Sequence, residues 1–150
     1  MLQYKSIHSF TTMLTLRRKG GLHTYLGITV SGFPNMFMVY TPQAPTALSN
    51  GPTIIETQVE TVVDMIKKLE SEEASSIEAT KQAEDEWQGL IDSMAQYTLI
   101  PATDSWWNGA NIPGKKTQGM IYVGGINMYE PQCRAAMDGW KGFEVMPANL

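Results

Sequence analysis

The chain has 150 residues, of which 43% are hydrophobic and 17% charged, and its formal net charge is −4. This length suffices for one domain with a core, and the charge argues against a general nucleic-acid binder, which carries a basic stripe. No apolar run in the sequence approaches the roughly 18 residues of a membrane span, so we expect a soluble protein with neither nucleic-acid nor membrane partners.

The N-terminal part of the chain is basic. Residues 1–55 contain no acid and four bases, Lys5, Arg17, Arg18 and Lys19, so they carry +4 while the remainder carries −8. A basic, hydroxyl-rich and acid-free opening is typical of an organelle transit peptide. A terminus without any structural role is the simpler interpretation. We therefore expect residues 1–18 to be a disordered leader and residues 19–150 to form the domain.

The single cysteine, Cys133, excludes an internal disulfide and suits a reducing compartment, so we expect a cytoplasmic protein. A nucleophilic role would need a nearby base, but both histidines, His8 and His23, lie far upstream. We predict a buried or half-buried structural thiol. Two histidines and one cysteine are also too few for a zinc site of ordinary ligand count.

Two β-strands are predicted near the start of the domain, at 24–30 and 37–41, because β-branched and aromatic residues are frequent there and turn residues separate them. The second segment is apolar almost throughout, as in a strand buried on both faces. Three prolines, with Asn50 and Gly51, then predict a shaped loop over 41–52.

Helices are predicted at about 53–70, 80–99 and 128–140, with a short strand at 119–124 between the last two. Either Thr80 or a capping box of Ser75 and Glu78 begins the second helix, and Pro101 ends it. Apolar residues four and three positions apart predict one apolar stripe on the first helix. The stripe consists of Ile55, Val59, Val62, Ile66 and Leu69.

Residues 109–116, G-A-N-I-P-G-K-K, come within one residue of a phosphate-binding P-loop. A P-loop needs a buried strand before it and a helix after it. Neither is predicted, Pro113 removes a backbone donor, and Lys116 replaces the required hydroxyl. We reject the P-loop. Two interpretations stay open: a surface loop whose rings pack on a neighbouring domain, or a lid that stacks Trp106 and Trp107 on a flat ligand.

Several motifs occur together and in order between Gly21 and Phe143. They are G-F-P-N-M-F-M-V-Y-T-P-Q-A-P-T-A-L-S-N-G-P, I-E-T-Q-V-E, S-W-W-N-G-A-N-I-P-G-K-K, Y-V-G-G-I-N-M-Y and G-W-K-G-F. With them the chain resembles the C-terminal part of Baeyer–Villiger monooxygenases of the cyclohexanone and phenylacetone monooxygenase type. The resemblance implies an α/β fold, namely the C-terminal portion of the FAD-binding Rossmann-like domain with long ordered loops.

The resemblance also implies roles for residues of this chain. Members of the family use FAD and NADPH to convert a ketone into an ester or lactone. Trp106, with Asn111 in the same loop, matches residues that contact NADP, and Ser49, Asn50 and Gly51 match the stretch beside the flavin. Substrate-pocket positions match Thr46, Ala47, Leu48 and Ile121. None of these residues is a catalytic acid, base or nucleophile.

Other parts of the family's pattern do not occur in these 150 residues. Neither GxGxxG turn is present, and the family's fingerprint and its active-site arginine are missing too. We therefore expect a fragment that is inactive alone and whose partners are a ketone and the enzyme's remaining N-terminal domains. The alternative is a non-catalytic binding module that keeps the fold.

Overall fold

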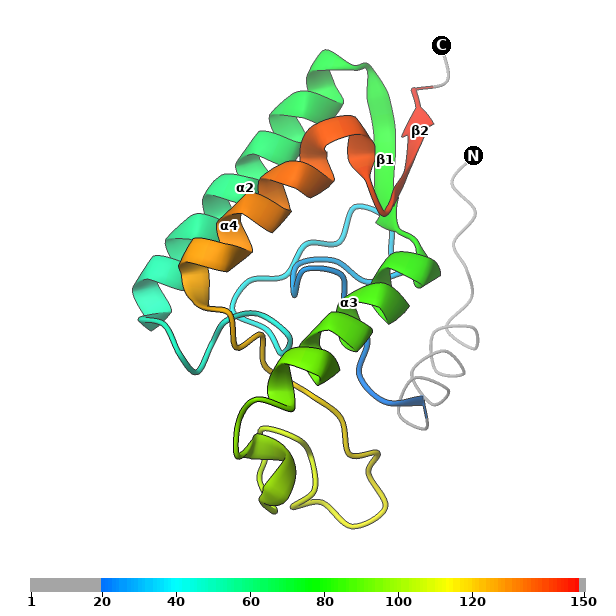
Figure 1. The fold of residues 1–150 in the computed structure, drawn as a ribbon. Helices are drawn as coiled ribbons and strands as arrows, with labels where there is room; N and C mark the ends of the chain where they lie inside the picture. Colours follow the sequence, from blue (N-terminus) through cyan, green and yellow to red (C-terminus); the bar gives the residue numbers. More distant parts are fainter. Residues whose placement is uncertain (1–19, 149–150) are drawn as a thin grey trace.

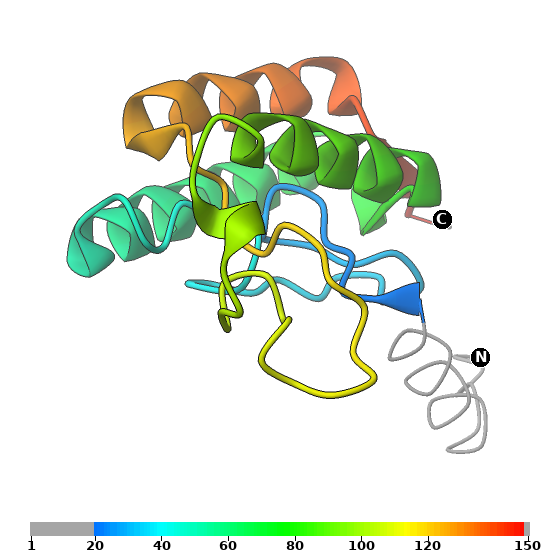
Figure 2. The ribbon, with the colours of Figure 1, turned by 60° about the horizontal axis from the view of Figure 1, so that its bottom comes forward.

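The computed structural model describes residues 20–148, a mixture of helices and strands with long irregular segments (Figure 1). The elements in chain order are α2 (Gly51–Ser71), β1 (Ala74–Ala79), α3 (Lys81–Ala95), the 3-10 turn η1 (Ile100–Ala102), α4 (Gly125–Met137), the 3-10 turn η2 (Asp138–Trp140) and β2 (Phe143–Pro147). Helices α2 and α4 lie side by side, and the irregular segments before α2 and between η1 and α4 lie below the helices in Figure 2.

The three predicted helices are confirmed, with shifts at their ends. Pro52 lies in the first turn of α2, where its missing N–H is not needed. Thr80 begins α3, because its hydroxyl accepts a 3.1 Å hydrogen bond from the Ala83 N–H. The α3 helix ends at Ala95 and not near residue 99, and α4 with η2 covers the segment predicted as a helix over 128–140.

Strands β1 and β2 form an antiparallel pair in which Ile77 lies opposite Val145. Neither strand is among the elements predicted from the sequence. The capping box is also wrong, since Ser75 and Glu78 lie inside β1. The two strands are about 70 residues apart in sequence, and no local pattern indicates such a pairing.

The predicted strands at 24–30, 37–41 and 119–124 are wrong, because these segments are irregular in the structure. Residues 25–29 form a tight turn closed by an isolated bridge between Tyr25 and Thr29, with Leu26 at φ 57°. Ile28 and Val30 are nevertheless buried. The β-branched and aromatic residues of this segment are frequent because the segment is buried, and not because it belongs to a sheet.

The predicted apolar stripe of α2 is displaced from the face that is buried. That face consists of Ile54, Gln58, Thr61, Met65 and Leu69, whereas Ile55, Val59 and Ile66 are exposed. The displacement arises because two members of the buried face are polar and hydrogen-bonded. The Gln58 side chain donates to the Tyr129 hydroxyl at 2.9 Å, and Thr61 donates to the Thr57 carbonyl.

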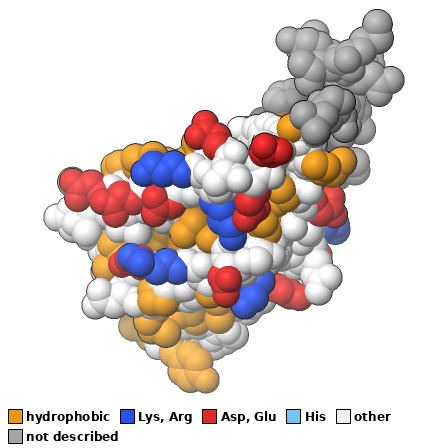
Figure 3. Space-filling view, turned by 90° about the horizontal axis from the view of Figure 1, so that it is seen from above, with side chains coloured by type: hydrophobic (Ala, Val, Ile, Leu, Met, Phe, Trp, Pro, Cys, Tyr) orange, Lys and Arg blue, Asp and Glu red, His pale blue; other side chains and the backbone are white. Residues whose placement is uncertain are grey.

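The core lies between the helices and the turn at residues 25–29. Trp87 from α3 stacks on Tyr122 with a ring separation of 5.0 Å, and Tyr129 from α4 donates to the Leu26 carbonyl at 2.6 Å. Cys133 is fully buried in this cluster, which confirms the structural thiol. On the face seen in Figure 3, acidic and basic side chains are interspersed with hydrophobic ones.

Two adjacent isoleucines test which face of α2 is buried. Ile54 is 0% exposed and Ile55 is 39% exposed. We expect Ile54→Ala to lower the free energy of unfolding by about 2–5 kcal/mol, because it opens a cavity. The matched variant Ile55→Ala should lower it by less than about 1 kcal/mol. Urea denaturation of both variants measures the difference, and equal losses would contradict the assignment of the face.

Cys133 provides a second test. Burial raises the pKa of its thiol to about 12, and only the thiolate reacts with alkylating reagents. We expect iodoacetamide to leave Cys133 unmodified in the folded protein at pH 8 and to label it in urea. Because the folded-state pKa is the higher one, this thiol stabilises the fold up to about pH 9 and its contribution declines as pH rises toward 12. Rapid labelling without denaturant would refute the buried position.

Candidate functional site

An aromatic pocket of about 170 Å³ opens between two irregular segments. One side, which we call the first wall, is residues 40–46. The opposite side, the second wall, is residues 106–120. The residues that line the pocket are Tyr40, Thr41, Pro42, Thr46, Trp106, Trp107 and Met120. The lining is largely apolar and aromatic, as in sites that bind flat organic molecules.

The two tryptophans of the second wall stack on each other, with ring centroids 3.5 Å apart and planes inclined by 30°. Trp106 is 62% exposed, whereas Trp107 is half-buried. A large aromatic ring that remains this exposed is unusual. The pair thus presents a ring face, held from behind by a second ring, to any flat molecule that enters the pocket.

The conformation of the tryptophan segment depends on Asn108, which is buried. Its side-chain amide donates to the carbonyls of Ile100 and Thr103 at 2.9 and 2.8 Å. Its side-chain oxygen accepts from the N–H groups of Ser105 and Ala110 at 3.3 and 3.0 Å. One side chain therefore hydrogen-bonds four backbone groups of this irregular stretch.

Backbone hydrogen bonds join the two walls directly. The Gln43 N–H donates to the Met120 carbonyl at 2.8 Å, and just beyond the second wall the Tyr122 N–H donates to the Ala44 carbonyl at 3.2 Å. From α3, the Trp87 indole N–H donates to the Gln43 carbonyl at 3.2 Å. The first wall is therefore fixed on both the core and the second wall.

Only two of the residues predicted for the site line this pocket, namely Thr46 and Trp106. One comes from the predicted substrate group and the other from the predicted cofactor group, so the pocket brings together one member of each. Asn111, Ala47 and Asn50 are exposed outside the lining. Leu48 is 61% exposed, whereas Ile121 is 2% exposed and faces the interior.

The remaining predicted residues, Ser49 and Gly51, lie at the start of α2 and also outside the pocket lining. We expected Gly51 to leave room for a flat cofactor. A side-chain carbon at this position would lie 3.3 Å from the Tyr40 hydroxyl. The space that Gly51 leaves is therefore taken by Tyr40, which reaches across from the first wall.

The sequence reasoning did not assign Tyr40, Thr41, Pro42 or Met120 to the site. Residues 37–41 are predicted to form a buried strand, and residues of such a strand are not expected to line an open pocket as Tyr40 and Thr41 do. In the structure Tyr40 has φ 56°, a conformation unfavourable to a bulky residue within a strand. The signal in the sequence was the proline at position 42, which indicates that a strand ends there.

The second wall contains two adjacent lysines, Lys115 and Lys116. Lys115 lies beside the Met120 sulfur at 3.8 Å, and Lys116 donates to the Gly20 carbonyl at 3.1 Å. Residues 117–124, which follow Lys116, are irregular and no helix begins until Gly125, so the rejection of the P-loop is confirmed. Within residues 20–148, no group of three potential metal ligands lies together, and no helix is long and apolar enough to cross a membrane.

Known proteins with similar sequences are monooxygenases. The chain is 41% identical over 128 residues to cyclohexanone 1,2-monooxygenase from Acinetobacter sp., covering 85% of this chain and 23% of that protein. It is 45% identical over 111 residues to a Baeyer–Villiger monooxygenase from Pseudooceanicola batsensis, covering 74% of this chain and 20% of the relative. No protein-family model matches.

Solved structures give the same result. The chain superposes on cyclohexanone monooxygenase from Rhodococcus sp. Phi1 bound to NADP+ with a TM-score of 0.79 and 40% identity, covering 87% of this chain and 25% of that one. It also resembles an oxidised steroid monooxygenase bound to NADP, with a TM-score of 0.79 and 29% identity.

The fold therefore matches part of a flavin monooxygenase. More narrowly, the resemblance to Baeyer–Villiger monooxygenases is confirmed, and the chain has the sequence and fold of a fragment of such an enzyme. It spans about a quarter of the length of the relatives that it matches.

Asn108 offers a test of how the second wall is held. We expect Asn108→Asp to release this segment, because the carboxylate cannot donate to Ile100 and Thr103. Trypsin should then cleave after Lys115 and Lys116 several times faster than in the unaltered chain. The control Asn111→Asp makes the same chemical change at an exposed position of the same segment and should leave the cleavage rate unchanged. Equal rates in the two variants would contradict the role of Asn108.

Proposed function

We propose that this chain supplies one side of the active site of an FAD- and NADPH-dependent Baeyer–Villiger monooxygenase, which converts a ketone into an ester or lactone. The observation that supports this most directly is the pocket in which Thr46, from the predicted substrate group, and Trp106, from the predicted cofactor group, line one space. Bound flavin supplies the oxygen-transfer chemistry in such an enzyme, and the protein positions the reactants and excludes water.

In this proposal each group of residues acts by position. Trp106 and Asn111 bind NADP, and Ser49, Asn50 and Gly51 lie beside FAD. Thr46, Ala47, Leu48 and Ile121 belong to the ketone pocket. Of these, Trp106 and Thr46 have the strongest structural support. Ile121 is buried, so its effect on substrate would be exerted through the packing of the neighbouring wall.

The pocket fits part of such a ligand. Its volume of about 170 Å³ is below the roughly 300–1,000 Å³ of complete small-molecule sites. In this proposal a single ring of the ligand lies against Trp106, and Lys115, whose amine is 3.8 Å from the sulfur of the pocket residue Met120, pairs with a phosphate of NADP. A dinucleotide does not fit inside it. The pocket therefore suits one side of a larger site whose opposite side another part of the enzyme supplies.

The proposed partner is the rest of the monooxygenase. Four apolar side chains around the pocket and the start of α2 are exposed, namely Val39, Tyr40, Leu48 and Trp106. A further domain packed here would bury them. In this arrangement residues 19–150 form part of the FAD-binding domain, and the single reduced Cys133 is consistent with a cytoplasmic enzyme.

Complementation tests the proposal. The chain is mixed with the acinetobacterial cyclohexanone monooxygenase from which the matching quarter has been deleted, and NADPH oxidation is followed after addition of cyclohexanone. We expect neither piece alone to be active and the mixture to oxidise NADPH in a ketone-dependent manner. Trp106→Ala should reduce the restored rate by roughly tenfold or more, because the cofactor loses its positioning ring.

Trp140→Phe is the matched control, because this tryptophan lies in η2 and donates to Glu72, away from the pocket. It should restore activity as well as the unaltered chain. Flavin absorbance and ketone oxidation by the chain alone would refute the expectation that it is inactive. A mixture that stays inactive, while the chain alone binds a protein or small ligand through the tryptophans, would favour a non-catalytic binding module.

A further inference from the structure

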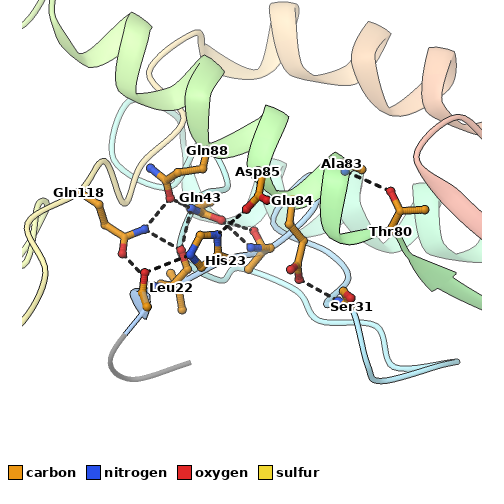
Figure 4. Close-up of polar contacts among 12 residues, drawn as sticks. Leu22, His23, Ser31, Gln43, Thr80, Ala83, Glu84, Asp85, Gln88 and Gln118 are labelled. Atoms are coloured by element: carbon orange, nitrogen blue, oxygen red, sulfur yellow. Dashed lines mark hydrogen bonds and ion pairs between the residues drawn. The ribbon is translucent and has the colours of Figure 1, made fainter. Parts of the chain in front are cut away.

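Three buried glutamines meet behind the pocket (Figure 4). Gln43 comes from the first wall, Gln88 from α3 and Gln118 from the second wall, and all three are among the buried polar residues. Burying an amide is costly unless its donors and acceptor are hydrogen-bonded. A cluster of three such side chains from three separate segments therefore depends on the bonds among them.

Gln88 is at the centre of this glutamine cluster. Its side-chain oxygen accepts hydrogen bonds from the side-chain amides of both Gln43 and Gln118. Its own amide donates to the Gly119 carbonyl at 3.2 Å. One side chain on a rigid helix thus holds a residue of the first wall and two adjacent residues of the second wall.

The outer ends of the cluster are bonded as well. The Gln43 oxygen accepts from the N–H and the hydroxyl of Thr24 at 2.8 and 2.7 Å. Gln118 donates to the Leu22 carbonyl at 2.6 Å and accepts from the Leu22 N–H at 2.8 Å. A side-chain carbon on Gly21 would lie 2.0 Å from the Gln118 oxygen, so glycine is required beside the cluster.

The hydrogen bonds of Gln43 hold the backbone of the first wall in an unfavourable conformation. Gln43 has φ 70°, a left-handed conformation that a non-glycine residue adopts only when its surroundings fix it. The side chain and carbonyl of Gln43 are bonded to Gln88, Thr24 and Trp87. Pro42, next along the first wall, lines the pocket, so the conformation at Gln43 affects the shape of that wall.

We propose that Gln88 is a positioning residue that sets the placement of Trp106 and Trp107 relative to the first wall. This role of Gln88 rests on the proposed function only in that the pocket is treated as a ligand site. The hydrogen bonds and the placement of the tryptophans are properties of this chain without any ligand. Without the Gln88 amide, the Gln43 and Gln118 amides keep only the Leu22 carbonyl as a shared acceptor. The two walls then lose their common attachment to α3, while their direct backbone hydrogen bonds remain.

Fluorine NMR of the chain labelled with 5-fluorotryptophan tests this. The four tryptophan signals are assigned by single replacements with phenylalanine. Gln88→Met keeps the side-chain size and removes the hydrogen bonds, and we expect the Trp106 and Trp107 signals to shift or broaden while the Trp140 signal stays in place. The control Gln82→Met lies on the same helix, where the native side chain is exposed and bonded to Glu86. It should leave all four signals unchanged.

A purely structural role would lower the melting temperature of Gln88→Met without moving the Trp106 and Trp107 signals, and that result would overturn the inference. If Gln88→Met does not fold, Gln118→Met removes one arm of the cluster and is expected to move the same two signals. Unchanged signals in that variant would also overturn it. Titration of NADP+ into the unaltered chain tests the proposed cofactor role separately. A Trp106 signal that does not respond to NADP+ counts against that role. The spectra recorded without ligand test the role of Gln88.

Discussion

The fold depends on one constraint: irregular backbone that is buried must find hydrogen-bond partners. The segments before α2 and between η1 and α4 lie against the core without forming a sheet. Side-chain amides supply the partners instead. Gln58 bonds the Tyr40 N–H, Asn108 bonds four groups of the tryptophan segment, and the glutamine cluster bonds both walls. Amide side chains suit this task because each both donates and accepts.

The same constraint explains how a site can be built from irregular segments. A wall fixed by several side-chain bonds holds its shape almost as a strand does, yet it presents exposed rings that a strand in a sheet would bury. Trp106 and Tyr40 are exposed in this way on opposite sides of one pocket. The pocket is too small to enclose a dinucleotide, and the exposed apolar residues around it indicate a surface that belongs against another domain.

The helices could be predicted from the sequence because their signals are local. The Thr80 cap and the spacing of apolar side chains three and four positions apart act within a few residues. The face of α2 could not be predicted by the same rule, since apolar spacing selects Ile55 and Val59 while the core contains Gln58 and Thr61. Gln58 is buried because its amide donates to the hydroxyl of Tyr129, some 70 residues away in sequence, whereas Thr61 donates to the Thr57 carbonyl of the same helix.

By itself the sequence determined the helical segments, the buried thiol, the rejection of a P-loop and the monooxygenase resemblance, because each depends on nearby residues or on motifs that can be read in order. The tertiary structure alone decided that β1 pairs with β2, that three apparent strands are irregular, and that Thr46 and Trp106 line one pocket. These features depend on contacts between residues far apart in the chain, and the residues that make such contacts carry no mark of their partners in the sequence.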